Sequence, residues 1–326
     1  MLTTLKRRTL WSAAIAATVV IILVAGPRYE ADVNPGPVPV FDDVEEYVTS
    51  VESNVPDIWE GAEKQIVWAR PDRSRTERSI VYVHGFSATR QEVAPLCDSL
   101  AARLDANLFY TRLTGHGRTG EAMADATVGD WLFDLREALA VGRALGRRTV
   151  IVASSTGATL AVWAVSGALA DEETEDVEAL VLMSPNFGPA DSRSNMLLMP
   201  WGKQLARLVI GEYREWEPYN EQQSRNWTTR YPVGALFPVM ASVDAVSRLD
   251  PAELKRPILV VYSPNDSVVN TTRIVEWFDG TASAPKALLE IPDTGDPSGH
   301  ILAGDILSPG TTERLTVVIQ QFLDSL

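Results

Sequence analysis

The sequence predicts an α/β fold: a mostly parallel sheet with helices on both faces and a helical cap inserted late in the chain. Short apolar runs alternate with helix-like segments, several of the runs are apolar throughout, and the alternation stops over residues 187–250. Strands covered on both faces form continuous apolar runs, and alternation of strand with helix is typical of a parallel sheet.

The seven apolar runs are the expected strands: Gln65–Ala69, Ser79–Val83, Asn107–Thr111, Thr149–Ala153, Ala179–Met183, Ile258–Tyr262 and Ala287–Ile291. The helix-like segments are Thr89–Leu104, Val128–Leu145, Thr156–Ala170, Thr271–Phe278 and Thr311–Leu323. We therefore expect an N-terminal segment over residues 1–30, a linker and extension over 31–60, a core over 61–186 and 251–326, and a cap over 187–250. The cap has no clear β signal and is partly amphipathic, so it is expected to be mainly helical, with its many aromatic residues packing it onto the sheet.

Composition narrows the class of protein. The 326 residues are 45% hydrophobic and 22% charged, which is typical of a globular chain. The net charge of −14 opposes binding to nucleic acid and to anionic lipid headgroups. Cys97 is the single cysteine, so neither an intramolecular disulfide nor a multi-cysteine metal site can form.

The N-terminus carries an uncharged, mostly apolar run from Thr9 to Gly26, directly after the basic residues 6–8. This length is near the lower limit for a membrane-spanning helix, whose basic side should stay in the cytoplasm. A cleaved signal peptide, followed by secretion, is the alternative. Cleavage after Ala25 would put Leu23 where a small residue is preferred, so we expect an uncleaved anchor and an extracytoplasmic body.

One short pattern suggests a nucleophile. The strand Thr149–Ala153 leads into Ser155, and a helix-like segment follows at once. Ala153 and Gly157 flank the serine at two residues on either side, as the sharp strand-to-helix turn of a nucleophile elbow requires. By itself the pattern is weak, because small-x-Ser-x-Gly also occurs in ordinary loops.

A serine nucleophile needs a base, and the chain has only three histidines. His84 and His116 both precede Ser155, whereas His300 follows it in the loop between the last strand and the last helix. A serine elbow on a parallel sheet requires the order serine, acid, histidine. Position and elimination therefore favour His300 as the base.

The acid should follow a strand that lies between the serine and the histidine in sequence. Asp266 does so, at a tight turn after the buried strand Ile258–Tyr262. From there its carboxylate could orient the ring of His300 and stabilise the imidazolium. Asp293 and Asp296 are alternative acids, but they share the loop of His300.

Acyl transfer also requires donors for the oxyanion, and two backbone N–H groups can supply them. Thr156 directly follows the nucleophile. Phe86 lies in the loop after the strand Ser79–Val83, where Gly85 allows a close approach. These two residues are the expected oxyanion hole.

Together these residues resemble the α/β-hydrolase superfamily, over about Gln65 to Leu326. The similarity is closest to the bacterial carboxylesterase and monoacylglycerol-lipase group, on three further motifs: His84-Gly85-Phe86, Leu113-Thr114-Gly115-His116-Gly117 and Val128-Gly129-Asp130-Trp131-Leu132-Phe133-Asp134. The chain departs from the pattern with Ala153 in place of glycine and Thr114 in place of proline.

The resemblance implies Ser155 as nucleophile, Asp266 as acid, His300 as base, and Phe86 and Thr156 as oxyanion donors. It implies serine-hydrolase chemistry and does not specify the substrate. We expect hydrolysis of a small carboxylic ester or lipid-like substrate, for which no metal or organic cofactor is needed. A thioesterase, an acyltransferase or a serine peptidase on the same fold is an alternative. A non-catalytic binding module on the same scaffold is a further alternative. A missing triad residue would favour it, but serine, aspartate and histidine are all present.

Overall fold

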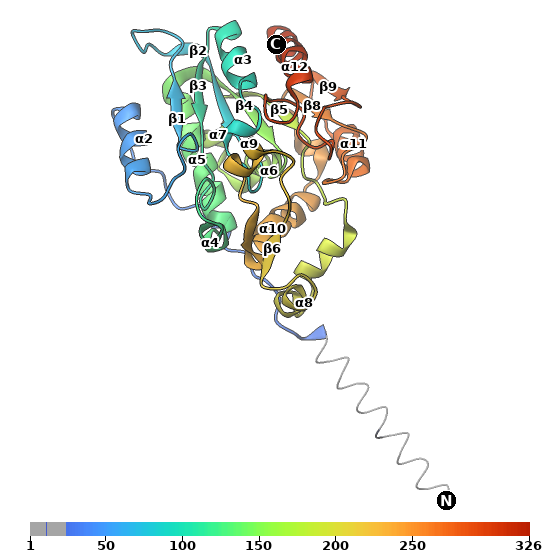
Figure 1. Cartoon of the computed structure of the whole chain (residues 1–326). Coiled ribbons are helices and arrows are strands. Elements are labelled where there is room, and N and C mark those ends of the chain that lie inside the picture. Colours follow the sequence, from blue (N-terminus) through green and yellow to red (C-terminus); the bar gives the residue numbers. More distant parts are fainter. Residues whose placement is uncertain (1–10, 12–23) are drawn as a thin grey trace, which may run out of the picture.

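The computed structural model describes Trp11 and residues 24–326, and a seven-stranded sheet lies at its centre (Figure 1). The strand order is β1-β3-β2-β4-β5-β8-β9. Only β1 is antiparallel to its neighbour; every other pair is parallel. The strands are β1 (Gln65–Val67), β2 (Thr76–Val83), β3 (Asn107–Tyr110), β4 (Gly146–Ser154), β5 (Val177–Met183), β8 (Ile258–Tyr262) and β9 (Lys286–Glu290). The predicted mostly parallel α/β fold is confirmed.

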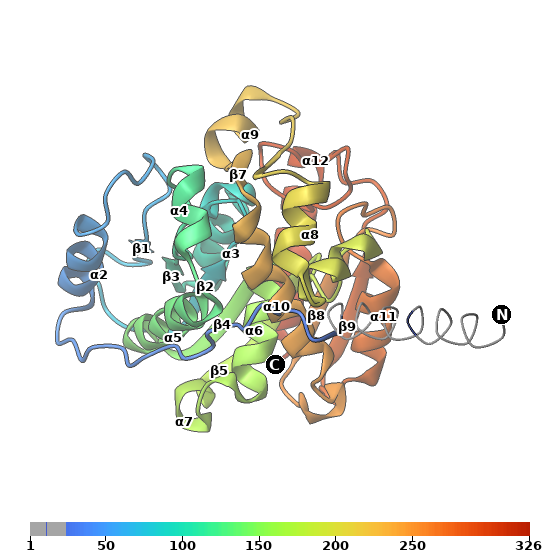
Figure 2. The same cartoon turned by 90° about the horizontal axis from the view of Figure 1, so that it is seen from below.

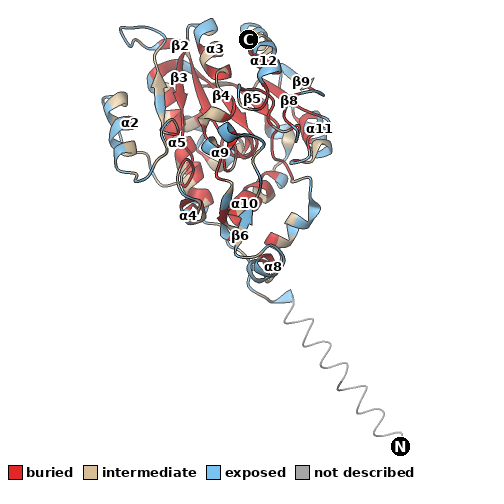
Figure 3. Ribbon diagram, in the orientation of Figure 1, coloured by how far each residue is buried: buried red, intermediate tan, exposed pale blue. Residues whose placement is uncertain are grey.

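Helices cover both faces of this sheet. The first face packs against α5 (Val128–Leu145), α6 (Thr156–Trp163), α10 (Leu236–Ser247) and α11 (Thr271–Gly280); the second packs against α3 (Leu96–Leu104) and α12 (Pro309–Asp324). Successive side chains of a strand point to opposite faces, so Ile151 of β4 enters the first core and Val152 the second. Figure 3 shows the central strands as the buried part of the molecule.

Two of the expected helices are interrupted. Pro95 stands inside the segment expected as Thr89–Leu104, and a proline cannot continue a helix from the preceding turn. That segment divides into the 3-10 turn η1 (Arg90–Glu92) and α3. Similarly, α6 ends at Trp163 and the chain continues as the short turn η2 (Ala164–Ala168). The short helices α2 (Val44–Ser53), α4 (Gly120–Asp125) and α7 (Asp171–Thr174) were not predicted.

The 187–250 segment lies between β5 and β8, which are neighbours in the sheet. Its elements are η3 (Ser192–Leu198), α8 (Gly202–Val209), β6 (Tyr213–Glu215), α9 (Glu221–Asn226), β7 (Arg230–Pro232), η4 (Val233–Ala235) and α10. In Figure 1, α8, α10 and β6 lie below the sheet, and Figure 2 is seen from that side. The β6–β7 pair was not expected, because three-residue strands rich in charged residues carry no apolar pattern.

The expectation of an N-terminal membrane anchor with an extracytoplasmic body is corrected. Its predicted span, Thr9 to Gly26, falls almost entirely outside the described residues. Across Trp11 and residues 24–326, no helix combines the length and the apolar character that crossing a bilayer requires. Even α5, with 18 residues, carries charged side chains such as Asp130, Arg136 and Glu137.

Candidate active site

Ser155 occupies a sharp turn between β4 and α6. Its backbone has φ 49° and ψ −117°, a conformation that a residue with a side chain adopts only under strain. Neighbouring backbone holds it there: its N–H donates to Met183 O (2.9 Å), and its carbonyl accepts from Asn186 N (3.2 Å). The serine side chain therefore projects from a fixed elbow at the carboxyl edge of the sheet.

The small flanking residues follow from how closely the backbones approach. A Cβ built on Gly157 would lie 2.4 Å from the carbonyl oxygen of Val83 and 2.6 Å from that of His84. Real Cβ atoms do not come so close, so glycine is required for α6 to cross the end of β2. Ala153 is fully buried, and its methyl group is accommodated in the core beside β4.

His300 and Asp266 are brought together from loops 34 residues apart. His300 Nδ1 lies 2.8 Å from Asp266 Oδ2, and the other carboxylate oxygen accepts from the N–H groups of Val268 (2.8 Å) and Val269 (3.0 Å). These bonds fix the carboxylate and direct His300 Nε2 away from it. The ring can then accept a proton at Nε2 while Nδ1–H stays bonded to Asp266.

Ser155 and His300 line the same small cavity, whose volume is about 10 Å³. Their side chains are not hydrogen-bonded to each other in this structure. Contacts of this kind often tighten only when substrate is bound. Ser155 is 8% exposed and Asp266 is 9% exposed, so the group is largely shielded from solvent.

The environment of His300 favours its protonated form. Burial lowers the pKa of the imidazole, but the charge of Asp266 and its hydrogen bond outweigh burial, and Glu92 and Asp296 add to the effect. The resulting pKa is above the ordinary value of 6.5. A raised pKa makes the imidazole a stronger base.

The other two histidines have structural partners. His84 Nε2 accepts from Leu113 N (3.0 Å), and its Nδ1 lies 2.9 Å from Gly85 O. Burial lowers the pKa of His84 to about 4, so the ring is neutral and ties the two loops together. His116 is fully buried beside the rings of His84 and Trp131, and burial likewise lowers its pKa.

The turn around His116 is held by the motif that follows it. Trp131 Nε1 donates to Thr114 O (3.0 Å), and Asp134 accepts from Thr114 N (2.5 Å). Both partners come from α5, whose first turn is capped by Thr127 in a capping box with Asp130. These two motifs therefore contact one another and support the loop beside the site.

Both expected oxyanion donors lie next to the elbow. Thr156 is the first residue of α6, so its N–H has no acceptor within the helix. Phe86 follows Gly85, and a Cβ built on Gly85 would lie 3.2 Å from the Cβ of Ser155. The two N–H groups thus stand on the two backbone segments that meet at the serine.

Asp296, an alternative acid in the sequence, has a different place. Its carboxylate accepts from His300 N (2.9 Å), Ile301 N (2.8 Å) and Ser298 Oγ (2.6 Å). It therefore fastens the backbone of the histidine loop, whereas Asp293 is exposed. Sequence reasoning missed Glu92 altogether, because a glutamate in a helix-like segment is ordinarily on the solvent side.

The 187–250 segment touches the loops of the site. Thr228 N donates to Ser87 O (2.7 Å), and the ring of Tyr231 lies 5.2 Å from that of Phe86. Trp227 packs in one apolar cluster with Ile301, next to His300. The segment therefore contacts both the candidate oxyanion loop and the histidine loop.

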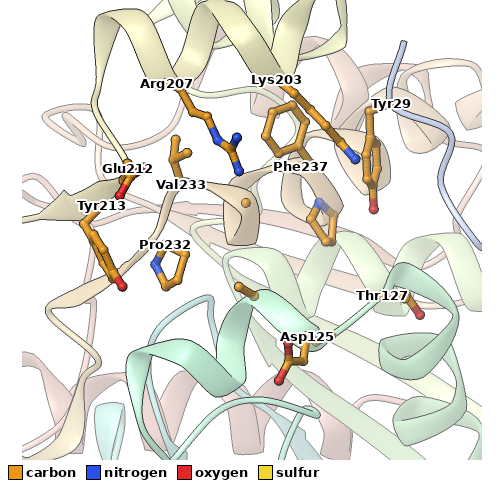
Figure 4. A pocket seen from close by; sticks show the side chains of 14 residues that line it. Tyr29, Asp125, Thr127, Lys203, Arg207, Glu212, Tyr213, Pro232, Val233 and Phe237 are labelled. Atoms are coloured by element: carbon orange, nitrogen blue, oxygen red, sulfur yellow. The ribbon is translucent and has the colours of Figure 1, made fainter. Parts of the chain in front are cut away.

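A second cavity, of about 500 Å³, is lined by neither Ser155 nor His300 (Figure 4). Lys203 and Arg207 of α8 line it together with Phe237 of α10, and Asp125 and Thr127 face them from the end of α4 and the start of α5.

Across Trp11 and residues 24–326, no group of three His, Cys, Asp or Glu side chains is arranged to hold a metal ion.

The alpha/beta hydrolase family matches residues 80–305, and this range makes up most of the chain. No curated protein matches the sequence. Among solved structures, a chain from the work on LipS and LipT, two metagenome-derived lipolytic enzymes, has a TM-score of 0.67 and 20% identity, covering 83% of this chain and 100% of that one.

Two further structures are similar at lower identity. The monoacylglycerol lipase of Paleococcus ferrophilus has a TM-score of 0.57 and 13% identity, covering 80% of this chain and 98% of that one. A soluble variant of the monoglyceride lipase of Saccharomyces cerevisiae has a TM-score of 0.60 and 12% identity, covering 81% and 90%. At such identities the likeness establishes a shared fold. The family match, together with the order of the strands and the strand-to-helix elbow, shows that this chain belongs to the alpha/beta hydrolase family.

Proposed function

We propose that this chain is a serine hydrolase that cleaves carboxylic esters. The observation that carries the proposal is the arrangement around one cavity: a serine on a strained elbow, and a histidine whose far nitrogen is bonded to a buried carboxylate. Nucleophile, base and orienting acid in this relation are the signature of covalent acyl transfer.

In the proposed reaction, Ser155 Oγ attacks the ester carbonyl carbon and its proton passes to Nε2 of His300. The carbonyl oxygen becomes an oxyanion that the N–H groups of Phe86 and Thr156 stabilise. His300 then returns the proton to the departing alcohol, which leaves an acyl group on Ser155. Water, deprotonated by His300, attacks this acyl-enzyme and releases the carboxylic acid.

Two observations favour an uncharged, lipid-like ester. The chain carries a net charge of −14, which opposes anionic substrates. The structures it resembles are described as a lipolytic enzyme and as monoacylglycerol or monoglyceride lipases. Neither observation sets the acyl length, so a chain-length series is the direct measurement.

The test is hydrolysis of p-nitrophenyl esters of increasing chain length by the wild type and by Ser155→Ala. We expect the substitution to lower kcat by about 10⁴-fold or more and to abolish labelling by a fluorophosphonate probe. Retention of activity in Ser155→Ala would refute the assignment. A thioester and a prolyl peptide belong in the same panel, and faster turnover of either would replace the ester as the substrate class.

A further inference from the structure

A buried carboxylate lies behind the candidate oxyanion loop and has no part in the reaction described above. Glu92, in η1, is 1% exposed. Its Oε1 accepts a hydrogen bond from the N–H of Gly85 (2.6 Å) and another from the hydroxyl of Tyr82 (2.6 Å). A buried carboxyl is costly unless such partners compensate it, so these bonds fix its position.

The same hydrogen bonds connect the two sides of the site. Gly85 directly precedes Phe86, the first oxyanion donor. The hydroxyl of Tyr82 also lies 3.1 Å from Oγ of Ser154, which directly precedes the nucleophile. Glu92 therefore links the oxyanion loop to the strand end that carries Ser155.

Gly85 is confined between the carboxylate and the nucleophile. A Cβ built on Gly85 would lie 3.2 Å from Glu92 Oε2 and 3.2 Å from the Cβ of Ser155. A Cβ at this position would be tight against both groups, so the Gly85 backbone lies close to the carboxylate and to the nucleophile. Glu92 and Ser155 therefore bound the space in which the backbone of Gly85 lies.

We propose that Glu92 is a positioning residue: its carboxylate ties Gly85 to Tyr82 and so holds the Phe86 N–H in place for the oxyanion. This inference rests on the proposed acyl-transfer function. Glu92 touches neither substrate nor the reacting atoms: it acts through the backbone, and its charge also helps to raise the pKa of His300.

The protonation state of Glu92 should matter little to this role. Burial raises its pKa to about 7, and the hydrogen bonds from Tyr82 and Gly85 together with the nearby His300 oppose that rise. In either state one carboxyl oxygen remains an acceptor, as does the amide oxygen of glutamine. Glu92→Gln should therefore preserve the hydrogen bonds to Gly85 and Tyr82, whereas Glu92→Leu removes the side-chain oxygens that accept them.

The test compares four variants of the full chain: Glu92→Leu, Glu92→Gln, Tyr82→Phe and the matched control Tyr110→Phe. Tyr110 lies on β3 with its ring edge-on to that of Tyr82 (5.9 Å), and its hydroxyl donates to a different carboxylate, that of Asp98 (2.6 Å), so Tyr110→Phe leaves the bonds of Glu92 in place. Each variant is assayed for kcat and KM on the best ester, for the rate of fluorophosphonate labelling of Ser155, and for its Tm.

We expect Glu92→Leu to lower kcat and the labelling rate by about 10- to 100-fold with KM changed less than about twofold, because oxyanion contacts form only in the transition state. Glu92→Gln should stay within about threefold of wild type, and Tyr110→Phe should match it. If Glu92→Leu does not fold, Tyr82→Phe should still lower the labelling rate relative to Tyr110→Phe at similar Tm.

Three outcomes would overturn the inference: a folded Glu92→Leu with unchanged rates, a loss confined to KM, or equal losses in Tyr82→Phe and Tyr110→Phe. Failure of the proposed function is seen separately. A wild type that reacts with fluorophosphonate but turns over no ester refutes the substrate class and leaves the labelling rates to judge Glu92. A wild type that does not react at all refutes both.

Discussion

The carboxyl edge of the sheet differs from the part of the 187–250 segment around α8, β6 and β7 in how side chains are held. At the sheet edge, Asp266 and Ser155 are buried, and backbone bonds fix the turns that carry them. In the 187–250 segment, Leu208 is 82% exposed and Val209 is 65% exposed at the end of α8. The strands β6 and β7 have only three residues each.

This difference indicates on which of the two regions the reaction depends. Buried, hydrogen-bonded backbone opens with a high free energy, whereas short elements with exposed apolar side chains belong to the less stable part of a fold. We therefore expect substitutions at the sheet edge to abolish the reaction and substitutions around the second cavity to change it little.

The largest effect is expected from Asp266→Asn. The N–H groups of Val268 and Val269 keep the amide oxygen on their side, so the amide NH2 faces His300 Nδ1 and donates to it. The ring is then held in the wrong tautomer, and kcat should fall by about 10⁴-fold. The measurement is ester hydrolysis with the folded state checked by circular dichroism. Asp293→Asn, which changes an exposed aspartate of the histidine loop, is the matched control and should retain full activity. Equal losses in both variants would reject Asp266 as the acid.

Gly157→Ala should come next. The added methyl group meets the carbonyl oxygens at the end of β2, so α6 must move away, at a cost of about 1–3 kcal/mol in the free energy of unfolding. Activity should fall with it, because Ser155 moves with α6. Gly310→Ala is the control, since nothing lies within 4 Å of a Cβ built there. Urea unfolding and kcat are measured for both, and an unchanged Gly157→Ala would contradict the close approach.

The pH dependence is expected to be smaller but specific. In the proposed reaction only neutral His300 can take the proton of Ser155, and the pKa of His300 is raised above 6.5 by Asp266. Thus kcat/KM should already be half lost at a pH above 6.5, and should fall about tenfold for each further unit of acidification. A half-point below 6.5 in the kcat/KM profile would show that the histidine is not coupled to Asp266 as described.

The smallest effect is expected from Arg207→Ala. The side chain lines the second cavity, not the one shared by Ser155 and His300. With an uncharged short-chain ester, kcat and KM should both stay within about twofold of wild type. A large fall in kcat would erase the distinction between the two regions and place the second cavity in the reaction path.

Much of the fold was readable from local pattern. Apolar runs predict all seven strands of the sheet. Ile258–Tyr262 is predicted with its observed bounds, because a strand buried on both faces tolerates few polar residues. Helix ends were less predictable. Pro95 broke one expected helix, and the three-residue strands β6 and β7 had no pattern to reveal them.

The sequence by itself determined the parallel sheet and the chain order of serine, aspartate and histidine, since both follow from residue types along the chain. Only the tertiary structure decided that Asp266 bonds to the ring of His300 while Asp296 bonds to the backbone of the histidine loop. In the sequence, both aspartates lie in turns from which either could reach the ring. Only the tertiary structure placed Glu92 behind Gly85. That contact depends on how η1 packs against the ends of β2 and β4, which no local pattern records.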